Sequence, residues 1–60
     1  MSTIAEKLMK EYKLDRKKAM ALADEMSIDI DQDWEFEETC YSFKDGSTLT
    51  IDSFNKATTE

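Results

Sequence analysis

The chain has 60 residues, 14 acidic residues against eight Lys and Arg, a net charge of −6, one Cys and no His. This length predicts a single small domain, residues 1–60, and a lone Cys without His excludes an internal disulfide and a Cys/His metal site. A core this small needs another source of stability, either tight packing or oligomerisation, and of the two we expect a homodimer.

The same features indicate a compartment. A single Cys and a first segment with charges every few residues are typical of a cytoplasmic protein rather than a secreted one. No stretch approaches the about 18 apolar residues of a membrane span. We therefore expect a cytoplasmic protein without a membrane partner, a metal or a cofactor.

Residues 3–26 predict a helical pair. Apolar residues recur at helical spacing in this half of the chain. Thr3 followed by Glu6 is a capping-box pattern, and Asp15 is a typical cap for a second helix. The predicted helices are about 3–12 and about 16–26, and Leu14 is expected to fill the gap between them.

From Ser27 onward the apolar residues alternate, which predicts β-strands. Asp45-Gly46 predicts a hairpin turn within a β-region of about 33–54. A two-residue turn would divide the apolar residues of the two strands between the faces. A three-residue turn with a left-handed Gly46 pairs Phe43 with Ser47 and gives one apolar face, so we prefer it.

The remaining elements follow from that register. Trp34 and Phe36 have the wrong parity for the apolar face, so they require a bulge near residues 37–40 or a separate strand. The last residues, 55–60, show no periodicity and are expected to fray.

These elements predict an α+β fold, in which two short N-terminal helices pack on a small antiparallel β-hairpin or meander (α-α-β-β). The predicted core is Leu8, Tyr12, Leu14, Leu22, Met26, Trp34, Phe36, Phe43, Leu49 and Ile51.

An acidic stretch, DIDQDWEFEE, runs from residue 29 to residue 38 and contains no basic residue. Its alternation is typical of a strand with a wet face, and its charge suits binding to a basic partner. The first three acids have calcium-loop spacing, but Trp34 and Cys40 stand where such a loop needs Gly and Glu. The candidate partner-binding acidic face is Asp29, Asp31, Asp33, Glu35, Glu37 and Glu38.

A basic cluster at the start of the second predicted helix suggests an alternative. The segment AEKLMKEYKLDRKKAMAL resembles a helix-turn-helix unit in its spacing, and the resemblance implies nucleic-acid contacts by Lys13, Arg16, Lys17 and Lys18. Lys13 and Met9 depart from the Gly and Ala usual at those positions, and no third helix is evident.

The sequence does not predict an enzyme. It has no His for acid–base work, neighbouring acids point apart, and Cys40 has no His to activate it. We expect a small acidic protein-binding or regulatory module, an accessory or inhibitory factor of viral or plasmid type. The alternatives are a helix-turn-helix-like DNA-binding regulator, and an acidic nucleic-acid mimic that blocks a DNA- or RNA-handling protein.

Overall fold

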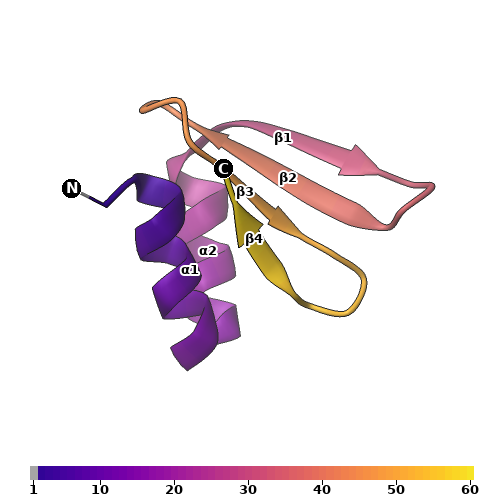
Figure 1. The fold of residues 1–60 in the computed structure, drawn as a ribbon, viewed down its shortest axis with the longest axis horizontal. Helices are drawn as coiled ribbons and strands as arrows, with labels where there is room; N and C mark the ends of the chain where they lie inside the picture. The colour runs from indigo at the N-terminus through magenta and orange to yellow at the C-terminus, as the bar shows by residue number, and fades with distance from the viewer. Residues whose placement is uncertain (1) are drawn as a thin grey trace.

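Two helices precede a four-stranded antiparallel sheet in the computed structural model, which describes residues 2–60 (Figure 1). The sheet is a meander in the order β1-β2-β3-β4. This confirms the predicted α+β class and its helix-before-strand order. The elements are α1 (Ile4–Leu14), α2 (Arg16–Met26), β1 (Ser27–Asp33), β2 (Glu38–Phe43), β3 (Thr48–Ile51) and β4 (Ala57–Thr59).

Both helices begin at the predicted caps. The Thr3 hydroxyl accepts from the backbone N–H of Glu6, and the Glu6 carboxylate accepts from the N–H of Thr3, which completes a capping box. At α2, the Asp15 carboxylate accepts from the N–H of Lys18 at 3.3 Å. One residue therefore ends α1 and caps α2.

The β2–β3 turn supplies two further caps to α1. The Asp45 carboxylate accepts from the N–H of Ile4 at 2.9 Å, and the Ser47 hydroxyl accepts from the N–H of Ala5 at 3.3 Å. Ser47 also donates its hydroxyl proton to Asp45. With the capping box, these bonds satisfy the N–H groups that begin a helix without an internal acceptor. Residues more than 40 positions apart thus fix the hairpin against the helix.

The β2–β3 register is the predicted one. The Phe43 N–H donates to the Ser47 carbonyl at 3.0 Å, and Gly46 has φ 87°, in the left-handed region. Tyr41 pairs with Leu49, so the large apolar residues of β2 and β3 share the face that the helices cover. The three-residue turn is confirmed.

The core lies between that sheet face and the helices, and small residues let the helices approach closely. α1 packs on β3 and β4, and α2 contacts β1 and β2. The sequence-based core omitted the three buried helical alanines, Ala57 and Tyr41. The buried apolar residues are Ala5, Leu8, Tyr12, Ala19, Ala23, Tyr41, Phe43, Leu49, Ile51 and Ala57.

Four members of the predicted core are exposed instead. Leu14 is 89% exposed because α1 continues through it, which turns it about 200° from buried Tyr12. Trp34 and Phe36 lie in the turn after β1, and Met26 ends α2 at 41% exposure. Leu22, also predicted for the core, is only partly buried.

The strand boundaries also differ at both ends of the sheet. β1 begins at Ser27, directly after α2, whereas the predicted β-region began near residue 33. A bulge between Ser27 and Asp29 shifts the β1–β2 register there. At the other end, residues 57–59 form β4 where we expected a frayed tail, and Glu60 exchanges two backbone bonds with Thr48. Backbone pairing and burial of Ala57 order this segment despite its weak pattern.

None of the helices in the described part of the chain, residues 2–60, is long and apolar enough to span a bilayer.

Candidate functional site

The β1–β2 hairpin extends beyond the helices, to the far side of the molecule from α1 (Figure 1). Every residue from 28 to 37 is exposed, including the whole of β1 after Ser27. The helices thus leave both faces of this strand to solvent, and this is where the sequence placed its acidic stretch.

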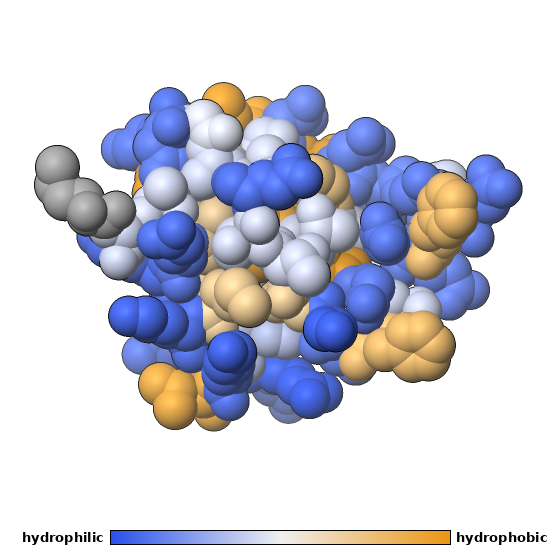
Figure 2. All heavy atoms as spheres, in the orientation of Figure 1, coloured by the Kyte–Doolittle hydropathy of each residue, from blue (hydrophilic) through white to orange (hydrophobic). Residues whose placement is uncertain are grey.

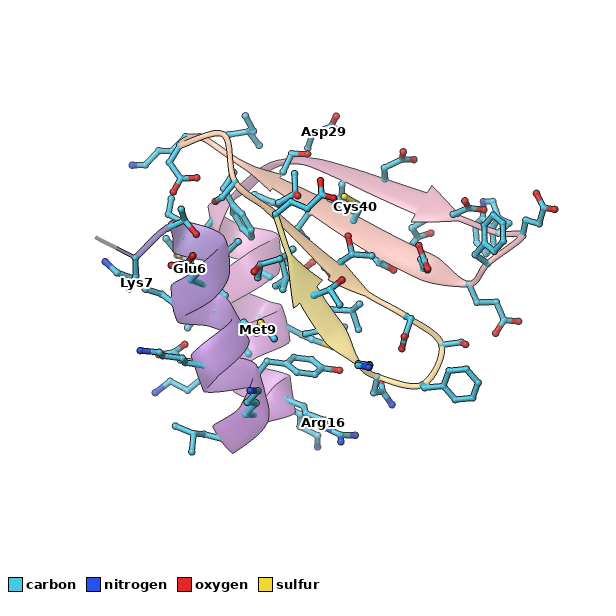
Figure 3. All side chains as sticks on the ribbon, viewed as in Figure 1. Glu6, Lys7, Met9, Arg16, Asp29 and Cys40 are labelled. Atoms are coloured by element: carbon cyan, nitrogen blue, oxygen red, sulfur yellow. The ribbon has the colours of Figure 1, made fainter. Side chains whose placement is uncertain are left out.

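Three of the predicted acids share one face of β1. Asp29, Asp31 and Asp33 alternate along the strand, so their side chains point the same way, about 6.8 Å apart. Asp33 pairs with Glu38, whereas Ile30 pairs with the buried Tyr41. Since cross-strand partners share a face, the acids lie on the sheet face turned away from the helices, as Figure 3 shows for Asp29.

Glu35 and Glu37 lie in the turn at the hairpin tip, and Glu38 begins β2 beside it. The Asp33 carboxylate accepts from the N–H groups of Glu35 and Phe36 at 3.0 and 3.3 Å, so it holds the turn as well as carrying charge. Glu37 has φ 53°, an uncommon left-handed conformation for a residue other than Gly. All six predicted acids thus lie on one hairpin. All are exposed except Glu38, which is partly buried.

Two aromatic side chains stand among these acids. Trp34 is 85% exposed and Phe36 is 63% exposed. Figure 2 shows an isolated hydrophobic group at this tip, surrounded by hydrophilic atoms. A shallow groove of about 360 Å³ adjoins the tip and is lined by Gln32, Asp33, Trp34, Glu37, Glu38 and Thr39. Sequence reasoning assigned the aromatic residues to the core, and the structure assigns them to this surface.

β1 is also an edge strand. It pairs with β2 alone, so its outer backbone groups have no strand beside them. Ile28 and Ile30 are 70% and 45% exposed along the same strand. An edge with exposed apolar residues is a template for strand pairing, and acidic side chains restrict which strands can approach.

The hairpin does not assemble a metal-ligand set. Within residues 2–60, no three Asp, Glu, Cys or His side chains are placed to hold a metal ion. Asp31 instead pairs across the strands with Cys40, which is partly buried beside Thr50.

The predicted basic residues are divided between two surfaces. Lys13 and Arg16 line a groove with Lys56, whereas Lys17 and Lys18 are exposed on α2 outside it. α2 leads directly into β1, so the described chain has no third helix to complete a helix-turn-helix core. Sequence reasoning missed Lys56 because 40 residues separate it from Arg16.

Among residues 2–60, two titratable groups have shifted pKa values, and both have a structural role. Hydrogen bonds lower the pKa of Asp45 to about 2, first that from the Ile4 N–H and then those from Ser47. Burial raises the pKa of Tyr41, and the nearby Asp24 carboxylate raises it further. Asp45 lies in the α1 cap and Tyr41 in the core, so neither points to a reactive centre on the acidic hairpin.

Comparisons of the chain with models of protein families, with curated proteins and with solved structures found no match.

Proposed function

We propose that this protein is a non-catalytic module that binds a partner protein through the acidic β1–β2 hairpin, residues 27–43. The observation that carries the proposal is the pair of uncovered aromatic side chains, Trp34 and Phe36, at the tip of a strand flanked by acids.

The aromatic residues supply the affinity in this proposal. Trp34 keeps most of its surface in water, which forgoes the hydrophobic stabilisation that a small domain needs. Trp is the residue most enriched among binding hot spots, and burying it against a partner recovers that stabilisation. Trp34→Ala should therefore weaken binding while leaving the fold intact.

The charges determine the class of partner. Between Lys18 and Lys44 the chain has eight acids and no base, and six of the acids lie on the hairpin. Such a field attracts a basic surface and repels an acidic one. We infer a partner whose contact surface is rich in Lys and Arg. A nucleic-acid-binding protein has such a surface. One form of the proposal is therefore an inhibitor that mimics nucleic acid and blocks such a protein.

The same charges argue against self-pairing through β1. Two antiparallel copies of this strand would bring the aspartates of one copy beside those of the other, and like charges across a ladder are destabilising. A homodimer through another surface stays a prediction, which sedimentation at several concentrations tests. Accessory or inhibitory function in the cytoplasm, and a viral or plasmid origin, are further parts of the proposal.

Affinity capture from a lysate of the source cells tests the proposal. We expect the parent protein to retain a basic protein that the Trp34→Ala/Phe36→Ala variant loses, and added salt to weaken the interaction. Phe54→Ala is the matched control, because Phe54 is 88% exposed but lies on the β3–β4 turn. Equal capture by parent and hairpin variant, or equal loss in the control, would contradict the proposal.

A further inference from the structure

A second surface, independent of the acidic hairpin, carries a different inference. A groove of about 390 Å³ lies where the end of α1, the start of α2 and the β3–β4 turn meet. Its charged lining residues are Lys13, Arg16 and Lys56, and its other lining residues are Met9, Tyr12, Asn55 and Ala57. In a chain of net charge −6, this groove has three cations and no acid in its lining.

The β3–β4 turn fixes the backbone of Lys56, one of the three cationic residues. The Asp52 carboxylate accepts from the N–H groups of Phe54 and Lys56 at 3.0 and 2.9 Å, and the Lys56 carbonyl accepts from the Asp52 N–H at 3.1 Å. Asn55 has φ 61°, which reverses the chain just before Lys56. The backbone of Lys56 is therefore held at the groove by a closed set of bonds.

A second cation is placed by an aromatic ring. The Arg16 guanidinium carbon lies 6.0 Å from the centre of the Tyr12 ring, within the range of a cation–π contact. Figure 3 shows Arg16 reaching from the first turn of α2 toward the side that carries the β3–β4 turn, with Met9 on α1. The start of α2 and the β3–β4 turn, which are distant in sequence, thus bring Arg16 and Lys56 to the same groove.

The Tyr12 hydroxyl supports a ligand in this groove. Tyr12 is 5% exposed and lines the groove, yet its hydroxyl has no hydrogen-bond partner in the structure. Buried hydroxyls are nearly always bonded, so this buried and unpaired donor behind the groove wall is suited to bond an anion once a neighbouring side chain moves aside.

We propose that this groove binds the phosphate group of a small phosphomonoester. Three cations more than balance the charge of one phosphate dianion, and a groove of this volume has room for the molecule that carries the phosphate. A duplex spreads its charge over many phosphates, and the acidic field of the remaining chain repels such a polyanion. The proposal therefore names a small phosphomonoester rather than DNA.

The test is an NMR titration of the ¹⁵N-labelled protein with adenosine monophosphate, inorganic phosphate, adenosine and a short DNA duplex. We expect saturable shifts at the amides of Arg16, Asn55 and Lys56 with adenosine monophosphate and with phosphate, and none with adenosine. Affinity should fall about tenfold in Arg16→Gln and in Lys56→Gln, since each loses a charge-assisted bond. Lys17→Gln removes an exposed charge outside the groove and should bind as the parent does.

Tyr12→Phe adds a readout that separates binding from folding. Removing an unpaired hydroxyl should leave the melting temperature unchanged or higher, while the affinity for phosphate falls. Four results would each overturn the proposal. They are chemical-shift changes spread over the whole of α2, an unchanged affinity in Lys56→Gln, no chemical-shift change with adenosine monophosphate or with phosphate, and tighter binding of the duplex. The last outcome would favour a nucleic-acid surface instead.

Discussion

Replacing Ser47 by Ala tests the connection between α1 and the β2–β3 turn. Ser47 is 4% exposed, and its hydroxyl is the acceptor for the N–H of Ala5, which is fully buried. The Ser47→Ala variant leaves that N–H without an acceptor, at a cost of about 1–3 kcal/mol. A protein of this size has about 3–9 kcal/mol in total, so a loss of about 2 kcal/mol is a large share. The melting temperature should fall by about 8–16 °C.

Circular dichroism during thermal and urea unfolding measures this change. Ser53→Ala is the matched control, because Ser53 is exposed and no side-chain bond is formed by it in the structure. The control should lie within about 0.5 kcal/mol of the parent. A Ser47→Ala variant as stable as the control would refute the view that the turn caps the helix.

Three further predictions concern the same framework. As pH falls from about 4 to about 2, the parent should lose its stability advantage over Asp45→Asn, because the pKa of Asp45 is about 2 in the fold and higher in the unfolded chain. Acid unfolding of both proteins measures this difference, and an advantage that stays constant over that pH range would contradict the prediction. Phe43→Ala should lower the free energy of unfolding by about 3–5 kcal/mol because Phe43 is 2% exposed, and Trp34→Ala should lower it by under about 0.5 kcal/mol because Trp34 is 85% exposed. Similar losses for the two variants in urea unfolding would be incompatible with this difference in burial. Gly46→Ala should lower the free energy of unfolding by about 1–2 kcal/mol through backbone strain at φ 87°, because an added Cβ meets nothing within 4 Å and so causes no clash. A variant as stable as the parent in thermal unfolding would contradict the argument from strain.

Local signals in the sequence predicted the parts of the fold that depend on local chemistry. The Thr3–Glu6 box and the Asp15 cap satisfy N–H groups three residues away, so their partners can be read from adjacent letters. Gly46 specifies a three-residue turn because few other residues adopt its conformation, and that turn determines the register of β2 and β3.

The errors concern features that depend on distant packing. Trp34 and Phe36 alternate with acids as a half-buried strand would, but burial needs a covering helix, and both helices lie at the other end of the molecule from the hairpin tip (Figure 1). The partners of Asp45 and Ser47 on α1 lie more than 40 residues away, and no pattern in the sequence connects them. Apolar pattern alone therefore identifies what can be buried, and tertiary contacts decide what is buried.

The candidate sites show the same division. Six acids in one segment predicted a charged surface, and the structure places them on one hairpin. Two lining residues of the cationic groove, Lys13 and Arg16, were among the predicted basic residues, but Lys56 joins them only through the sheet meander. A charged surface formed by consecutive residues can be predicted from the sequence, whereas one formed by residues of separate elements cannot.

The backbone bonds between Glu60 and Thr48 have a practical consequence for handling the molecule. Thr48 follows Ser47, which binds Ala5, so the last residue of the chain is anchored close to the first turn of α1. The start of α1 and the last residue of the chain therefore both lie away from the tip at Trp34 (Figure 1). A fluorescent label or immobilising tag fused at either end would leave that tip unobstructed, and a short linker joining the two ends would permit a circular permutant opened in the β3–β4 turn.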